Sequence, residues 1–150
     1  MAAVKRLLTH PVFLALVGIA VGQELIRASL DKIAYPDLFA DIVHDYDMLP
    51  PIAINAFALI MPWTEMVAGA VLVLGMLPWL GAWRRGAGLL STLLFAAFLI
   101  AIAQAELRGL KIECGCFDVG GMSSSQASWS LFARDIPLLL GSLLVWRKGQ

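Results

Sequence analysis

The chain has 150 residues, with 11 basic and 11 acidic side chains and a formal net charge of zero. Sixty per cent of the residues are hydrophobic, only 15% are charged, and the mean hydropathy is +0.82. This composition excludes an ordinary soluble domain and indicates a membrane protein whose main partner is the lipid bilayer. The balanced charge argues against nucleic acid as a partner.

Four apolar runs are long enough, or nearly so, to cross a bilayer as helices of roughly 20 residues. They cover residues 8–30, 52–77, 86–105 and 129–146. Because a backbone in lipid must satisfy its own hydrogen bonds, we expect an all-α protein, a four-transmembrane-helix bundle forming one domain over residues 1–150. The first run also resembles a signal peptide, but it is long for one, so we expect it to remain as a helix.

The charges in the connections predict the orientation. Eight acidic residues lie in the connections 31–51 and 106–128, whereas the other ends of the runs carry basic residues and no acidic ones: Lys5, Arg6, Arg84, Arg85, Arg147 and Lys148. The positive-inside rule therefore places both termini in the cytoplasm, and residues 31–51 and 106–128 on the outer side.

A short amphipathic helix is predicted between the first two runs. Pro36 suits the first position of a helix. Apolar residues then recur at helical spacing, and three acidic residues line the opposite face: Leu38, Phe39, Ile42, Val43 and Tyr46 against Asp37, Asp41 and Asp45. This pattern is typical of a helix on the membrane surface. The acidic face matches no metal-ligand spacing, so we predict no metal site there.

The only two cysteines are Cys114 and Cys116, separated by Gly115. Residues this close can form a disulfide, and glycine tolerates the backbone angles of the small ring. Such a ring is strained and easily reduced, which favours a reversible thiol–disulfide pair. Two alternatives remain: a structural bridge, or Cu(I) held by two thiolates with Met122 as a third soft ligand.

Ionisable residues inside the predicted spans are costly unless they are paired. Glu24 and Arg27 share one helix face, Glu65 lies near the middle of the second run, and Arg134 and Asp135 lie in the fourth. One interpretation is an ion-pair network in which Arg27 and Arg134 neutralise Glu65 and Asp135. The other is a polar cavity under the cysteines that relays protons or holds a quinone head group. The sequence identifies no certain cofactor, and a quinone is the one candidate, which the cavity of this second interpretation would accommodate.

Several of these residues carry a family resemblance over nearly the whole chain. The stretch Arg108-Gly109-Leu110-Lys111-Ile112-Glu113-Cys114-Gly115-Cys116-Phe117, followed by Trp129 and Arg134-Asp135, resembles the MauE family of methylamine-utilisation membrane proteins, within the wider DoxX-like group of four-helix membrane proteins. The N-terminal half is also similar at Lys32-Ile33, Pro36, Phe39, Tyr46, Leu49-Pro50, Pro62-Trp63-Thr64-Glu65 and Gly69. Asp118 departs from the family pattern, where glycine is common.

The resemblance implies a role beside a periplasmic thioredoxin-like partner in maturing methylamine dehydrogenase, whose small subunit is rich in disulfides. Our hypothesis is therefore a thiol–disulfide oxidoreductase of the bacterial inner membrane, with Cys114 and Cys116 as its catalytic residues on the periplasmic side. Glu65, Arg134, Asp135, Arg27 and Glu24 are its expected supporting polar network. Two rival hypotheses are a Cu(I)-binding membrane protein and a non-catalytic assembly factor.

Overall fold

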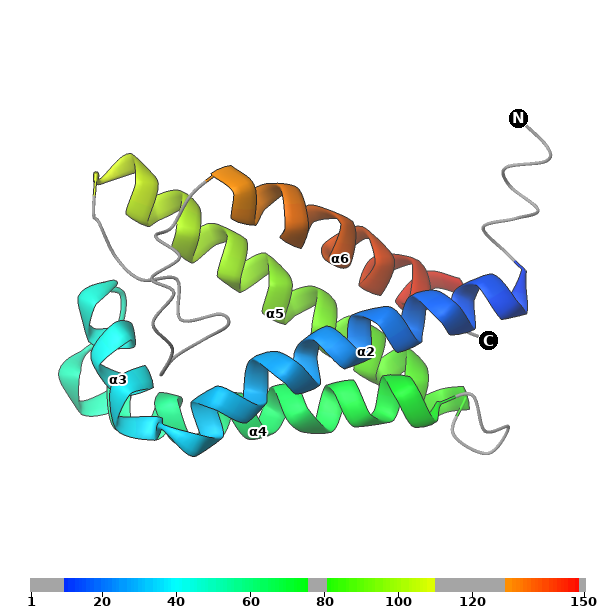
Figure 1. Cartoon of the computed structure of the whole chain (residues 1–150), viewed down its shortest axis with the longest axis horizontal. Coiled ribbons are helices and arrows are strands. Elements are labelled where there is room, and N and C mark those ends of the chain that lie inside the picture. Colours follow the sequence, from blue (N-terminus) through cyan, green and yellow to red (C-terminus); the bar gives the residue numbers. More distant parts are fainter. Residues whose placement is uncertain (1–9, 76–80, 110–128, 149–150) are drawn as a thin grey trace.

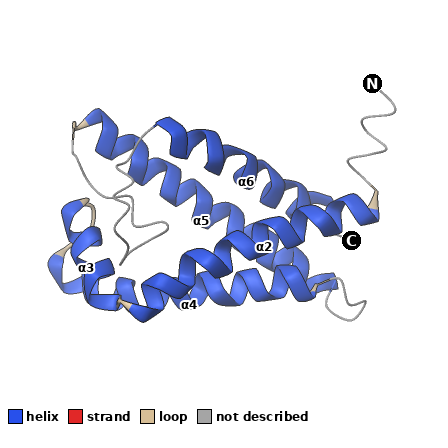
Figure 2. Cartoon of the chain, viewed as in Figure 1, coloured by secondary structure: helices blue, strands red, loops and turns tan. Residues whose placement is uncertain are grey.

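The structure is a computed structural model that describes residues 10–75, 81–109 and 129–148 (Figures 1 and 2). Within these ranges every regular element is an α-helix. The helices are α2 (Pro11–Ala34), α3 (Pro36–Asp45), α4 (Pro51–Leu74), α5 (Gly81–Leu107) and α6 (Trp129–Lys148). The all-α prediction is therefore confirmed for the described residues.

The four long helices form a bundle in which α2 packs mainly on α4 and α5 mainly on α6 (Figure 1). Chain neighbours in the bundle are antiparallel, since Gly75 after α4 lies against Arg84 of α5, and Gly88 of α5 lies against Trp146 of α6. Three of the described helical segments are long and apolar enough to cross a membrane: Pro11–Ala34, Pro51–Leu74 and Trp83–Leu107. The chain is thus a multi-pass membrane protein, and a fourth crossing by α6 stays a prediction.

Prolines set several of the helix boundaries. Pro11, Pro36 and Pro51 each lie at the start of a helix, where the missing N–H costs no hydrogen bond. The residue before a proline disfavours the helical region, and Tyr35 accordingly leaves it with φ −129° and ψ 66°. The first helix therefore ends at Ala34 rather than at residue 30, and this extension brings Lys32 into the helix.

The amphipathic helix predicted after Pro36 is confirmed as α3. Its apolar residues Phe39, Ile42 and Val43 are buried, and they pack against the N-terminal half of α4 in a small core with Ile54, Ala58 and Met61. The position of α3 at the outer surface of a membrane stays a prediction. In Figure 1, α3 lies at one end of the bundle, beside the end of α2 and the start of α4.

A second, larger core lies between the long helices. It contains buried residues from four helices: Val21, Leu25, Ala68, Leu72, Ala87, Phe95 and Val145. Close to it, α2 and α4 cross at Gly22 and Gly69, where a Cβ added to either residue would come within 2.7 Å of the other's carbonyl oxygen. Small residues allow such close approach between membrane helices. The contact between Gly22 and Gly69 therefore sets the register of α2 against α4.

Candidate functional site

A buried ion pair joins α2 to α4. Lys32 Nζ donates hydrogen bonds to both carboxylate oxygens of Glu65, at 2.8 Å to Oε1 and 3.0 Å to Oε2. Both side chains are completely buried. Two isolated charges could not be buried in this way without a large desolvation penalty, so each requires the other. Lys32 is two residues from the end of α2, whereas Glu65 lies in the middle of α4.

Two aromatic rings complete the surroundings of the Lys32 ammonium. Its Nζ lies 5.2 Å from the centroid of the Phe39 ring on α3 and 4.8 Å from that of Phe98 on α5. Both distances are within the range of a cation–π contact. Lys32 therefore contacts three other helices at once. The pair also lies between the two apolar cores, because Phe39 belongs to the core under α3 and Ala68 and Leu72 of α4 belong to the larger one.

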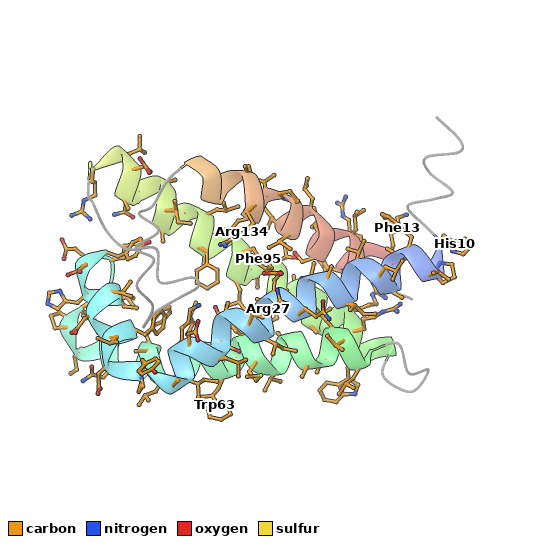
Figure 3. All side chains as sticks on the ribbon, viewed as in Figure 1. His10, Phe13, Arg27, Trp63, Phe95 and Arg134 are labelled. Carbon is orange, nitrogen blue, oxygen red and sulfur yellow. The ribbon has the colours of Figure 1, made fainter. Side chains whose placement is uncertain are left out.

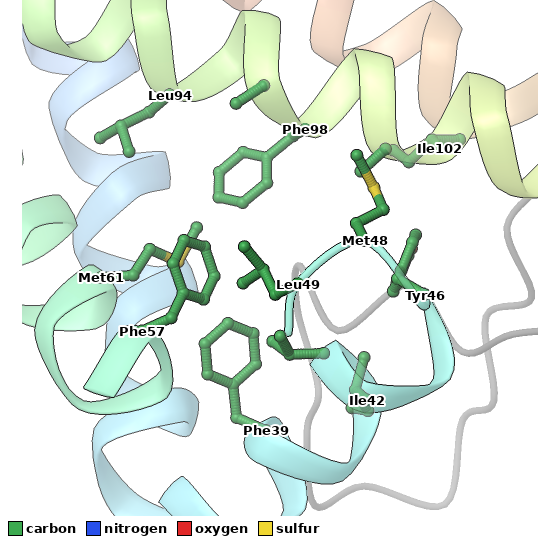
Figure 4. Close-up of a pocket in the computed structure, with 13 residues that line it drawn as sticks. Phe39, Ile42, Tyr46, Met48, Leu49, Phe57, Met61, Leu94, Phe98 and Ile102 are labelled. Atoms are coloured by element: carbon green, nitrogen blue, oxygen red, sulfur yellow. The ribbon is translucent and has the colours of Figure 1, made fainter. Parts of the chain in front are cut away.

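The same two rings line a cavity of about 280 Å³ between α3, α4 and α5 (Figure 4). The wall consists almost entirely of carbon and sulfur atoms. It is formed by Phe39, Ile42, Val43, Tyr46, Met48, Leu49, Phe57, Met61, Leu94, Ala97, Phe98, Ala101 and Ile102. The cavity thus lies directly beside the ion pair, with Phe39 and Phe98 between them.

The predicted pairing of Glu65 with Arg27 or Arg134 is wrong, because Lys32 is its partner. Arg27 instead lies 3.7 Å from Glu24 on the same helix, and its side chain is 73% exposed. Sequence reasoning assigned Lys32 to a loop, where it is the only lysine or arginine in residues 31–51. A single cation directly at the end of an apolar run, among acidic residues, was the signal that could have identified it.

Arg134 and Asp135, two residues of the expected network, form an ion pair with each other. Arg134 Nε lies 3.1 Å from Asp135 Oδ1, and the Asp135 side chain is only 3% exposed. Figure 3 shows Arg134 on α6 and Arg27 on α2. These residues thus take part in three ion pairs, Arg27–Glu24, Lys32–Glu65 and Arg134–Asp135. The polar cavity that we considered as an alternative was expected under the cysteines, which lie outside the described residues, so it stays a prediction. The cavity that the structure describes next to Phe39 and Phe98 is apolar.

Cys114 and Cys116 lie outside the described residues. The chain leaves α5 toward them through Arg108 and Gly109, at the end of the bundle where α3 lies (Figure 1). Arg108 contacts the residues that follow α3: its Nη2 is 3.2 Å from Asp47 Oδ2 and its Nη1 is 3.3 Å from the Tyr46 carbonyl oxygen. Gly109 has a φ of +65°, which glycine adopts without strain. The end of α5 is therefore anchored to the connection between α3 and α4.

Comparison with known proteins gives one consistent family. The family model described as "Methylamine utilisation protein MauE" matches residues 10–147. Similar curated proteins carry the name "Methylamine utilization protein MauE". The one from Methylorubrum extorquens is 31% identical over 145 residues, covering 95% of this chain and 74% of the relative. The one from Paracoccus denitrificans is 28% identical over 139 residues, covering 92% and 70%. The one from Paracoccus versutus is 35% identical over 112 residues, covering 74% and 56%. No solved structure gives a significant match.

Proposed function

Because the chain belongs to the MauE family of methylamine utilisation proteins, we propose that it is a membrane thiol–disulfide oxidoreductase. Cys114 and Cys116 exchange a disulfide with a periplasmic thioredoxin-like protein, during maturation of a disulfide-rich enzyme such as methylamine dehydrogenase. The observation that carries the proposal is that the only two cysteines form a Cys-Gly-Cys sequence. A bridge across so short a loop removes little chain entropy, so stability alone is a poor reason for it.

The exchange requires no other group. A thiolate of the partner attacks one sulfur of the Cys114–Cys116 disulfide, and the other cysteine leaves as a thiolate. The second thiolate of the partner then attacks this mixed disulfide and releases the reduced pair. The partner gains the disulfide, and the two electrons of its thiols remain on Cys114 and Cys116.

The anchored end of α5 supports this role. Cys114 follows Gly109 by five residues. An extended chain of this length spans about 18 Å at most, which bounds the distance of Cys114 from the end of the helix. Because Arg108 is tied to Asp47 and Tyr46, this end is held against the α3–α4 connection. The rigid part of the bundle thus supplies a fixed base for the segment that a soluble partner must reach.

The distribution of basic residues supports the orientation that exchange in the periplasm needs. Arg84 and Arg85 at the start of α5 and Arg147 and Lys148 at the end of α6 lie at one end of the bundle, since Gly88 packs on Trp146. The α3 end is the opposite one (Figure 1). With α6 as the fourth crossing, the positive-inside rule puts the basic end in the cytoplasm of a bacterial inner membrane and the α3 end outside.

The direct test is to trap the mixed disulfide. Cys116→Ser leaves a single thiol at position 114, and Cys114→Ser leaves the one at 116. Such a thiol can still attack the disulfide of the oxidised partner, which is the exchange in reverse, but the chain then has no second thiol to release the adduct. We expect one variant to accumulate a covalent adduct, sensitive to reductant, with a periplasmic thioredoxin-like protein. The matched control carries both substitutions and should form none. The proposal is overturned if neither variant forms an adduct while both insert in the membrane, or if the doubly substituted protein keeps full maturation activity.

A further inference from the structure

The cavity between α3, α4 and α5 has a composition that points to a particular class of ligand. We propose that it binds the ring of a lipid-soluble quinone, which accepts the two electrons left on Cys114 and Cys116. The acceptor role rests on the proposed function, whereas the binding of the ring rests on the cavity alone.

The wall of the cavity suits a flat conjugated ring better than a saturated chain. Four aromatic side chains line it, Phe39, Tyr46, Phe57 and Phe98, out of 14 aromatic residues in the chain. Aromatic pairs gain energy beyond the area that they bury when rings stack with an offset or meet edge to face. The two thioethers of Met48 and Met61 add favourable contacts with a ring and adapt to its shape.

The ligand must come from the lipid phase. An apolar cavity does not retain water, because a water molecule needs two or more polar partners. The helices that form its floor, α4 and α5, are two of the three segments that can cross a membrane. The cavity is also open rather than sealed, since Met48 and Phe57 in its wall are 42% and 38% exposed. A ring can therefore enter from the bilayer while its apolar tail stays outside.

The size is consistent with a single ring. A volume of about 280 Å³ is close to the lower end of the roughly 300–1,000 Å³ that is usual for small-molecule sites. The wall is also held firmly where the ring would stack. Phe39 and Phe98 are fixed from behind by the Lys32 ammonium, and Lys32 in turn is fixed by both oxygens of Glu65.

A quinone balances the chemistry of the proposed function. Two thiols become a disulfide and release two electrons and two protons, and one quinone takes up both to become a hydroquinone. The thiol pair is oxidised and the quinone is reduced, with no other reactant. Because an uncharged hydroquinone is soluble in the bilayer, it can leave by the route through which the quinone entered.

The test uses the purified full chain in detergent and decylubiquinone as the probe. Ala101→Phe places a phenyl ring in the cavity, and Ile100→Phe places the same ring on the neighbouring position, which is 61% exposed. We expect saturable binding to the unmodified protein and to Ile100→Phe, and binding weaker by at least about tenfold in Ala101→Phe. Phe57→Leu, which removes one ring near the surface, should also weaken binding. This milder variant keeps the test valid if Ala101→Phe does not fold.

Two further measurements separate this inference from the proposed function. Cys114→Ser/Cys116→Ser should bind decylubiquinone normally, and the reduced unmodified protein should convert it to the hydroquinone. Equal binding by Ala101→Phe and Ile100→Phe, or equal competition from a compound with the decyl tail but no ring, would overturn the site. If decylubiquinone does not bind but the single-cysteine variants still form mixed disulfides, the quinone site is overturned and the proposed function stands. Binding without reduction by the dithiol would overturn the acceptor role.

Discussion

Lys32 Nζ lies 2.8 Å from Glu65 Oε1, and neither side chain is exposed. The contact joins two positions that are 33 residues apart in sequence, at the level where the larger core meets the core under α3. Since Lys32 also contacts Phe39 and Phe98, it connects four helices around one charge. The pair therefore joins α2 to α4 at the point where α3 and α5 also contact Lys32.

Replacing Lys32 by methionine should destabilise the protein strongly. The substitution keeps a long apolar side chain but leaves the Glu65 carboxylate buried without a partner. Breaking a buried pair in this way costs about 3–5 kcal/mol. The free energy of unfolding of the two proteins can be compared in mixed micelles, with circular dichroism used to monitor the loss of helix.

Two controls show whether the effect of Lys32→Met comes from breaking the buried ion pair or simply from removing a positive charge. Lys32→Met/Glu65→Met removes both charges, and it should be more stable than Lys32→Met alone. Arg27→Gln removes a cation that is 73% exposed and 3.7 Å from Glu24, and should change stability by less than about 1 kcal/mol. A Lys32→Met variant as stable as Arg27→Gln would show that the buried pair does not hold the helices together.

Gly22→Ala should loosen the contact between α2 and α4. The new Cβ would come within 2.7 Å of the Gly69 carbonyl oxygen, so the helices must move apart. Overpacking of this kind costs roughly 1–3 kcal/mol. Gly86→Ala is the matched control, because a Cβ at that position meets no atom within 4 Å and alanine favours a helix. Thermal unfolding in detergent should rank Gly22→Ala below the unmodified protein and Gly86→Ala at or above it. The reverse order would mean that the two helices do not cross at these glycines.

Thiol labelling of intact cells tests the orientation. If the basic end of the bundle is cytoplasmic, the segment that follows Gly109 emerges on the outer side. A membrane-impermeant thiol reagent should then label Cys114 and Cys116 in reduced, unbroken cells. A cysteine introduced near Arg84 in the Cys114→Ser/Cys116→Ser background should react only after the membrane is opened. The opposite labelling pattern would show that Cys114 and Cys116 face the cytoplasm, where a periplasmic partner could not reach them.

The local structure could be predicted from the sequence, whereas the contacts between helices could not. The apolar runs and Pro36 predicted the helices, and the spacing of Phe39, Ile42 and Val43 predicted the buried face of α3. The partner of Glu65 depends on the register between α2 and α4. That register depends on the close crossing at Gly22 and Gly69. The G-x-x-x-G spacing of Gly18 and Gly22 marks a packing face of α2, but it does not identify the residues of α4 that this face meets. The cavity was missed for the same reason, because its wall combines three helices.

The central claim is that Cys114 and Cys116 form one reversible disulfide, and a redox titration of the purified protein in detergent tests it most directly. We predict a single two-electron thiol couple that disappears in Cys114→Ser/Cys116→Ser, with a potential above the roughly −300 mV that marks structural disulfides. Circular dichroism should show an unchanged helical bundle in both redox states, since so short a loop cannot constrain the helices. The absence of a couple, a potential below about −300 mV, or unfolding on reduction would contradict the account.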